Sequence, residues 1–249
     1  MDLNAYLQRI GYRGEPVPTL ETLRAMHRAH AFAVPFENLD ISRGVRIEVD
    51  ETVNFEKIVR RGRGGFCLEL TGLFARALRE IGFDVDVIGA RVMTDGHLGH
   101  PMSHMTLIVH LDEDWIADVG FGGRIVEPLR LNDRGDQVFG LRRYVVENDG
   151  DHWFVTCAET GYASMTYLFI MQPREFDEFH EVCRWLQTSP ESRFTQGDVI
   201  SLATADGRNT LAGRRLITFD GKRREERELS EAEAAAVCRE RFGFDLPPA

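Results

Sequence analysis

The residues best suited to covalent chemistry lie around Cys67, in the run RGGFCLE that begins at Arg63. Gly64 and Gly65 allow the backbone to bend tightly, and a helical pattern begins directly after them. Cys67 is therefore expected at a helix N-terminus, where unpaired N–H groups and the helix dipole favour an anion. Because the thiolate is the nucleophilic form of cysteine, this position predicts a nucleophile.

The helix dipole alone is too weak to ionise this thiol at neutral pH. It contributes about 0.3 to 1 kcal/mol at an ordinary site, whereas one pKa unit corresponds to about 1.4 kcal/mol. A strong nucleophile at Cys67 therefore needs a second partner, and an imidazolium would serve. The alternative is a cysteine that only fills the core, which is our interpretation of Cys157, Cys183 and Cys238.

His104 and Asp118 lie in the two halves of a predicted β-hairpin. Apolar residues alternate in both halves, and an acidic run around Glu113 separates them. With the turn centred on Glu113, the numbers of paired residues sum to about 226. This places His104 opposite Phe121 or Gly122. His104 and Asp118 both have even numbers, and the sum for paired residues is even, so both side chains can point to one face of the sheet.

The pairing of His104 with Asp118 would satisfy a carboxylate that is costly to bury alone. Cys67, His104 and Asp118 can thus act as nucleophile, base and orienting group in that chain order. The alternatives are a structural histidine at 104 and a surface carboxylate at 118. A metal site is a further alternative, because His97 and His100 closely precede His104. The segment contains glycine and proline and lacks a paired CxxC motif, so we predict no metal.

The elements that must position these residues change in character along the chain. The first third has helical periodicity, including residues 3–10, a segment opened by Thr19, and residues 68–81. Residues 83–170 follow a period of two, which predicts an antiparallel sheet or barrel. The last third mixes both patterns, and a capping box at Ser230 opens its final helix.

Composition excludes several classes of protein. The chain has 249 residues, of which 40 are acidic and 30 are basic, so its net charge of −10 repels nucleic acid. No apolar run approaches the roughly 20 residues that span a bilayer, and the N-terminus lacks a signal-peptide pattern. We therefore expect a soluble, cytoplasmic protein whose four cysteines stay reduced.

Four motifs, taken in order, resemble those of the arylamine N-acetyltransferases. They are PFENL at 35–39, RGGFC at 63–67 followed by Glu69, SHM at 103–105, and DVGFGG at 118–123. Weaker similarities at residues 6–11 and 241–243 extend the likeness over most of the chain. Each motif alone is modest, but the ordered set is highly specific.

The resemblance implies an α+β fold related to the papain-like Cys-His-Asp architecture. Residues 1–82 would form a helical bundle that carries the nucleophilic cysteine. Residues 83–172 would form an antiparallel β-barrel that carries the histidine and the aspartate. Residues 173–249 would form an α/β lid, which the somewhat short chain predicts to be reduced.

The resemblance also implies acetyl transfer from acetyl-coenzyme A to an arylamine or arylhydrazine by a ping-pong route. Cys67 would hold the acetyl group, His104 would activate the thiol, and Asp118 would fix the tautomer and orientation of His104. The backbone N–H of Cys67 is a candidate oxyanion donor. Acetyl-coenzyme A is thus the expected acyl-donor substrate. We expect no metal, nucleic acid or membrane partner, and make no prediction of oligomeric state.

Further residues receive roles through the resemblance alone. Phe36 and Phe66 look like walls of the acceptor pocket, Phe121 and Gly122 would line the cleft with Val92 and Ser103 nearby, and Phe194 resembles a lid aromatic near the coenzyme. Arg63 and Glu37 resemble a structural ion pair that holds the cysteine loop. Thr71 stands where the family commonly has asparagine.

The phosphates of coenzyme A must be bound by local cations, because the chain as a whole is acidic. Arg214-Arg215 and Lys222-Arg223-Arg224 are the candidates, and the alternative is that each is a solvated surface charge.

Three other functions fit the same residues. An amide synthase would use this site to close or release a biosynthetic acyl chain. A thiol hydrolase or protease would pass the acyl group to water. A catalytically silent binding domain would leave Cys67 with ordinary thiol reactivity.

Overall fold

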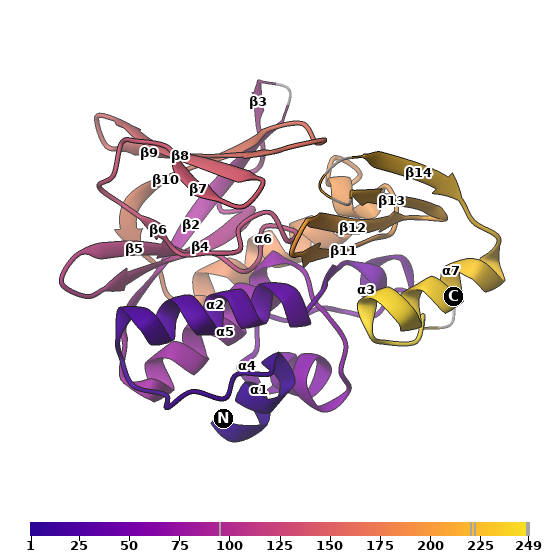
Figure 1. The fold of residues 1–249 in the computed structure, drawn as a ribbon, viewed down its shortest axis with the longest axis horizontal. Helices are drawn as coiled ribbons and strands as arrows, with labels where there is room; N and C mark the ends of the chain where they lie inside the picture. Colours follow the sequence, from indigo (N-terminus) through magenta and orange to yellow (C-terminus); the bar gives the residue numbers. More distant parts are fainter. Residues whose placement is uncertain (95, 220, 222, 248–249) are drawn as a thin grey trace.

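The computed structural model describes residues 1–94, 96–219, 221 and 223–247. Along the chain it has a helical part, a large antiparallel sheet and a smaller antiparallel sheet (Figure 1). The predicted α+β class with a barrel-like sheet is therefore confirmed. Among the described residues, no helix is both long enough and apolar enough to cross a membrane.

The helical part begins and ends its helices at the local signals of the sequence. Its elements are α1 (Leu3–Ile10), α2 (Leu20–Ala33), the short strand β1 (Phe36–Glu37), α3 (Leu39–Ser42), α4 (Glu51–Phe55), the π-helix η1 (Glu56–Arg60) and α5 (Cys67–Ile81). Asp2 caps α1 by accepting a hydrogen bond from the Ala5 N–H at 3.0 Å. Thr19 caps α2 in the same way, and α5 begins one residue before the predicted helix.

The large sheet is nearly closed into a barrel. Its strands are β2 (Asp84–Thr94), β3 (His97–Leu98), β4 (His104–His110), β5 (Asp114–Ala117), β6 (Leu129–Arg130), β7 (Gln137–Phe139), β8 (Arg142–Asp149), β9 (His152–Glu159) and β10 (Met165–Pro173), in the order β6-β5-β4-β2-β10-β9-β8-β7, with β3 beside β2. A side chain joins the two end strands. The Gln137 amide accepts from the Arg130 N–H at 2.8 Å and donates to the Arg130 carbonyl at 3.0 Å.

The turn between β4 and β5 is centred one residue earlier than predicted. His110 pairs with Asp114, because the turn contains three residues. Strand β5 also ends before the pairing could reach His104. The prediction that His104 lies opposite Phe121 or Gly122 is therefore wrong.

The smaller sheet draws its first strand from the helical part. The C-terminal elements are η2 (Phe176–Phe179), α6 (His180–Thr188), η3 (Arg193–Thr195), β11 (Val199–Thr204), β12 (Gly207–Ala212), β13 (Arg215–Phe219), β14 (Arg224–Glu228), α7 (Glu231–Val237) and η4 (Cys238–Phe242). The sheet order is β1-β11-β12-β13-β14, with Phe36 paired to Ser201. Phe36 also forms a parallel bridge with Gly65. Strand β1 therefore connects the loop before Cys67 to the C-terminal sheet.

The hydrophobic core of the helical part extends into the C-terminal third. Phe179, Val182 and Leu186 belong to the same buried cluster as Leu70 and Phe74 of α5. Segments distant in sequence are thus interlocked by packing as well as by strand pairing. The boundaries at residues 82 and 172 stay a prediction.

Helix α2 buries two histidines, His27 and His30, in this core. Both rings lie against Phe74, at centroid distances of 5.8 and 5.6 Å. Burial lowers the pKa of His27 to about 4, although the negative charge of Asp118 opposes the change. Burial also lowers the pKa of His30 well below its usual value. Both rings are therefore neutral at neutral pH.

Replacing His27 with glutamine is expected to change how stability depends on pH. The folded-state pKa of His27 lies below its unfolded value, so the unfolded chain takes up the proton first as pH falls. The unfolding free energy of the wild type relative to H27Q should be constant above about pH 6.5 and fall by about 2 kcal/mol at about pH 5. Chemical denaturation of both proteins across this range measures the difference.

The comparison with H27Q is needed because another buried group titrates in the opposite sense. Burial raises the pKa of Glu69, and Lys57 lowers it only in part, so Glu69 stabilises the fold as pH falls. Glu69 is present in both proteins, and subtraction removes its contribution. A difference between wild type and H27Q that stays flat down to about pH 5 would contradict a neutral, buried His27.

Candidate active site

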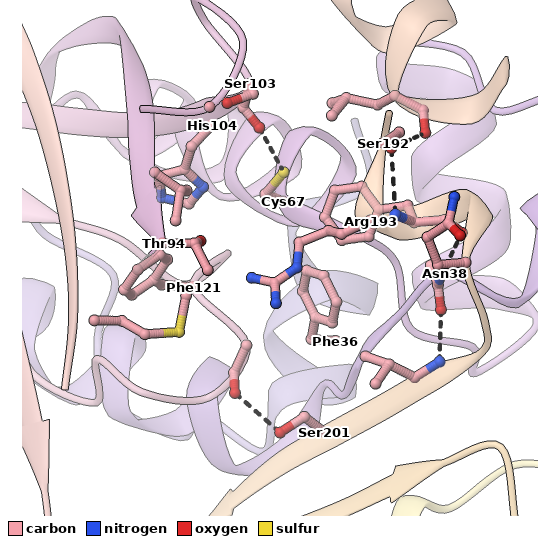
Figure 2. A pocket seen from close by; sticks show the side chains of 18 of the residues that line it. Phe36, Asn38, Cys67, Thr94, Ser103, His104, Phe121, Ser192, Arg193 and Ser201 are labelled. Atoms are coloured by element: carbon pink, nitrogen blue, oxygen red, sulfur yellow. Dashed lines mark hydrogen bonds between the residues drawn. The ribbon is translucent and has the colours of Figure 1, made fainter. Parts of the chain in front are cut away.

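A cavity of about 940 Å³ brings together Cys67 at the start of α5 and His104 at the start of β4. Figure 2 shows both side chains facing this space. Six residues predicted for the cleft line the same cavity: Phe36, Val92, Ser103, Phe121, Gly122 and Phe194. Phe66, predicted as a wall, is instead fully buried, with its ring 5.9 Å from that of Phe194.

Cys67 is the first residue of α5 and is 3% exposed. Its thiol donates a long hydrogen bond to the Ser103 carbonyl, with a sulfur–oxygen distance of 3.7 Å. Burial, followed by the negative charge of Asp118, raises the pKa of Cys67. The backbone N–H groups of Cys67 and Leu68 lower that pKa only in part. An unaided thiol at this position thus stays protonated at neutral pH.

His104 is held by one hydrogen bond and by two aromatic rings. Its Nε2 lies 2.6 Å from Asp118 Oδ2, and neither side chain has more than 2% exposure. The rings of Phe121 and Tyr167 each lie 5.1 Å from the imidazole. The contact with Asp118 makes Nε2 the protonated nitrogen, which leaves Nδ1 as the acceptor.

Asp118 directly follows β5. Both oxygens of its carboxylate and its backbone N–H form hydrogen bonds. Oδ2 bonds to His104, and Oδ1 accepts from the Gly120 N–H at 2.9 Å. The Asp118 N–H donates to His27 Nε2 at 3.1 Å. The carboxylate is completely buried, and these partners supply the hydrogen bonds that such burial requires.

Gly120 lies so close to α5 that no larger residue fits. A Cβ atom there would be 2.9 Å from the Cys67 carbonyl oxygen and 3.0 Å from the Cys67 Cα. It would also lie 2.5 Å from Thr71 Oγ1, a buried hydroxyl without a hydrogen-bond partner among the described residues. This glycine therefore lets the loop after Asp118 pack directly on α5, the helix that begins at Cys67.

A buried cluster of charges supports the loop before α5. Lys57 Nζ lies 2.8 Å from both Glu69 Oε1 and Asp40 Oδ2. Arg63 Nη2 lies 2.7 Å from Glu37 Oε1, the contact expected from the resemblance, and 3.0 Å from Asp40 Oδ1. Because removal of one partner would leave a buried charge unpaired, the cluster resists distortion of this loop.

The cavity wall contains a group of arginines that the sequence analysis missed. Arg124, Arg193 and Arg208 all line it. Arg208 Nε and Arg142 Nη2 each lie 3.2 Å from the one carboxylate of Glu159. Burial, followed by the positive charge of Arg208, lowers the pKa of Arg124 to about 10. The wall thus holds three arginines beside the carboxylates of Glu191 and Asp198, although the chain as a whole carries a charge of −10.

Arg193 extends its guanidinium into the cavity (Figure 2). Within the part of the chain that the structure describes, its side chain has no ion pair and no protein hydrogen-bond partner. A cation in this position is available to an anionic ligand. Two of these arginines could have been found from their neighbours in the sequence. Arg124 directly follows Gly122-Gly123, and Arg193 precedes Phe194.

The basic residues predicted to bind the coenzyme lie elsewhere. Arg214, Arg215 and Arg224 are at the outer strands of the smaller sheet and form ion pairs with nearby glutamates. Arg223 lies 3.3 Å from a glutamate as well. None of these four lines the cavity. Lys222 lies outside the described residues.

Two of the histidines considered as metal ligands have other contacts. His104 bonds to Asp118, and the ring of His100 stacks on Trp185 at 4.4 Å. Among the described residues, no group of three or more His, Cys, Asp or Glu side chains is arranged to hold a metal ion.

Comparison with known proteins identifies the family. A family model described as N-acetyltransferase matches residues 19–249. The pineal gland isozyme of arylamine N-acetyltransferase from Gallus gallus is 34% identical over 99% of this chain and 95% of its own length. The arylamine N-acetyltransferase of Mycolicibacterium smegmatis is also 34% identical, over 99% of this chain and 93% of its own.

Solved structures agree with the sequence comparison. The structure of M. smegmatis arylamine N-acetyltransferase superimposes with a TM-score of 0.92, at 34% identity, over 99% of this chain and 93% of that chain. The Mycobacterium marinum enzyme in complex with CoA superimposes with a TM-score of 0.89, at 31% identity, over 98% of this chain and 93% of that chain. This chain therefore belongs to the arylamine N-acetyltransferases, a family of acyltransferases.

Proposed function

We propose that this protein transfers an acetyl group from acetyl-coenzyme A to arylamines or arylhydrazines through an acetyl-Cys67 intermediate. The observation that carries the proposal is the shared cavity of Cys67 and His104, with Asp118 2.6 Å behind the imidazole. The comparison structure with bound CoA supports the donor, and the names of the relatives support the acceptor.

In the first half-reaction, the Cys67 proton moves to His104 Nδ1 as the sulfur attacks the thioester carbonyl. Asp118 stabilises the resulting imidazolium, which compensates for the cost of ionising a buried thiol. The N–H groups of Cys67 and Leu68, which have no acceptor within the helix, can stabilise the tetrahedral oxyanion. Collapse of this intermediate breaks the bond to the coenzyme sulfur, and the imidazolium protonates the departing thiolate.

In the second half-reaction, the amine nitrogen attacks the acetyl carbonyl on Cys67. His104 accepts the proton that the amine loses, and returns it to the cysteine sulfur as the C–S bond breaks. Phe36, Phe121 and Phe194 line the cavity and offer apolar faces to an aromatic ring. This lining favours an aryl acceptor over a small aliphatic amine.

Mass measurement tests the proposal directly. Incubation with acetyl-coenzyme A without amine should add one acetyl group to the intact protein and release one equivalent of coenzyme A thiol. Peptide mapping should place that group on Cys67, and addition of an arylamine should remove it. An enzyme that never gains the group would overturn the proposal.

The other functions that fit the sequence give different results in the same assay. A thiol hydrolase would lose the acetyl group rapidly to water in the absence of amine. An amide synthase would be acylated by a carrier-bound long acyl chain in preference to acetyl-coenzyme A. A silent binding domain would leave Cys67 unacylated.

Replacing Arg193 with glutamine is expected to raise the KM for acetyl-coenzyme A about fivefold and leave kcat within about twofold. The unpaired guanidinium in the cavity can bind a phosphate of the coenzyme, and loss of such a contact at a partly exposed site costs about 1 kcal/mol. Steady-state kinetics at low and high salt measure the effect, which should shrink as salt screens the charge.

Arg215→Gln is the matched control for Arg193→Gln. It removes the same charge from β13, where Arg215 lies 3.6 Å from Glu226 and does not line the cavity. Its KM should equal that of the wild type. Equal KM changes in the two variants would mean that only the overall charge matters, and no change in either would exclude Arg193 from coenzyme binding.

A further inference from the structure

His27 lies at the junction between the two elements that carry Cys67 and Asp118. It belongs to α2, far from both in sequence, and has no exposed surface. Its Nε2 accepts a hydrogen bond from the Asp118 N–H at 3.1 Å. Its ring meets Phe74 of α5 edge to face, with the centroids 5.8 Å apart. One imidazole therefore touches both the end of β5 and the helix of the nucleophile.

The hydrogen bond from Asp118 fixes the chemical state of His27. A backbone N–H can only donate, so Nε2 must carry a lone pair and the ring must be neutral with its proton on Nδ1. The titratable groups that face this ring are the carboxylate of Asp118 and the imidazole of His30, one helical turn away. Burial keeps both histidines neutral, so the acceptor at Nε2 is present throughout the physiological pH range.

We propose that His27 is a positioning residue, which sets the place of Asp118 by holding its backbone while Asp118 holds His104. Asp118 follows the last residue of β5, so the sheet no longer supplies a hydrogen-bond acceptor for its backbone N–H. Without His27, this buried donor would be unsatisfied, and the chain between Ala117 and Gly120 would have to shift to find another acceptor. Such a shift would move the carboxylate away from His104 Nε2.

The inference rests on the proposed role of Asp118 and adds a residue that does not touch the cavity. His27 is absent from the residues that line it. Its effect should therefore reach the reaction only through the Asp118–His104 pair. A change in acceptor or coenzyme affinity is not expected, because nothing at the cavity surface is altered.

Two amide substitutions separate the hydrogen bond from the packing. In H27Q, the side-chain oxygen can reach the place of Nε2, whereas in H27N the shorter amide reaches only the place of Nδ1. Both are neutral and polar, and they differ by one methylene group. If H27N does not fold, H27M tests the same loss. Methionine fills the space but does not replace the imidazole nitrogen that accepts from the Asp118 N–H.

The rate at which acetyl-coenzyme A acetylates the enzyme in a single turnover is the first readout. H27N and H27M should be about 10- to 100-fold slower than wild type, because a carboxylate displaced by about 1 Å loses that much. H27Q should stay within about threefold of wild type. His30→Met removes a neighbouring buried histidine of the same helix that has no contact with Asp118, and should keep the wild-type rate.

The pH dependence of iodoacetamide alkylation at Cys67 is the second readout, which packing alone would not move. H27N should require a higher pH for alkylation, because the imidazolium that stabilises the thiolate is less well paired. H27Q should keep the wild-type profile. Equal rates and profiles for H27N and H27Q, both folded, would overturn the inference.

The two proposals fail in different ways. If wild type is not acetylated at all, the proposed function fails. If wild type is acetylated on Cys67 and H27N matches it, only the role of His27 fails.

Discussion

Replacing Cys67 with alanine is expected to lower kcat/KM for acetyl transfer by at least about 10⁴-fold and to abolish acetylation of the protein. No other cysteine can take its place. The other three cysteines are also buried, and the cavity wall contains none of them. Burial raises the pKa of Cys157 and Cys183 too, so neither thiol is ionised at neutral pH.

Cys183→Ala is the control for this result. Cys183 lies in α6 within the same hydrophobic cluster as Cys67, and its thiol donates to the Ile47 carbonyl at a sulfur–oxygen distance of 3.6 Å. The variant should be acetylated like the wild type, provided that both proteins are folded under the assay conditions. Acetylation of the Cys67→Ala protein to the wild-type level would show that the acetyl group is carried elsewhere.

Replacing Asp118 with asparagine is expected to lower kcat by about 10³- to 10⁴-fold with little change in KM. The amide can turn its NH₂ group toward His104, which would then accept at Nε2 and carry its proton on Nδ1. A protonated Nδ1 cannot take the proton of Cys67, so the thiolate does not form. The amide also carries no charge to stabilise an imidazolium, and both losses act on the chemical step.

The same hairpin provides a matched control at Asp114. Its Oδ1 lies 2.7 Å from His110 Nδ1, so this pair resembles the His104–Asp118 pair in chemistry but is partly exposed. Asp114→Asn removes one of the interactions that raise the pKa of His110 and should leave kcat at the wild-type level. Equal losses in the two variants would mean that the hairpin, and not the charge of Asp118, supports the reaction.

Much of the fold followed from local patterns. The start of α1, the start of α2 at Thr19 and the start of α5 are confirmed within one residue, because each depends on chemistry within one turn. The predicted register of the hairpin was wrong, because its turn is centred one residue earlier than expected. An acidic run does not show how many residues form the turn. Strand β14 was missed because all of its residues are charged and exposed, so it has no apolar alternation.

The candidate site could be predicted less completely than the fold. Motif order located Cys67, His104 and Asp118, but periodicity cannot show that a histidine from α2 meets the backbone of residue 118. The arginines of the cavity were missed for a similar reason. The predicted coenzyme site consisted of runs of basic residues, whereas Arg124, Arg193 and Arg208 stand singly in separate segments that meet only in the folded chain.

Strand β1 makes the support of the loop before Cys67 depend on a strand that is synthesised much later. On the ribosome, Phe36 emerges long before Ser201, its partner in β11. The loop at Gly65 bridges to Phe36 and lacks its final support during this interval. Contacts between residues so distant in sequence form late in folding. Support for the loop before Cys67 is therefore completed only once β11 is available to pair with β1.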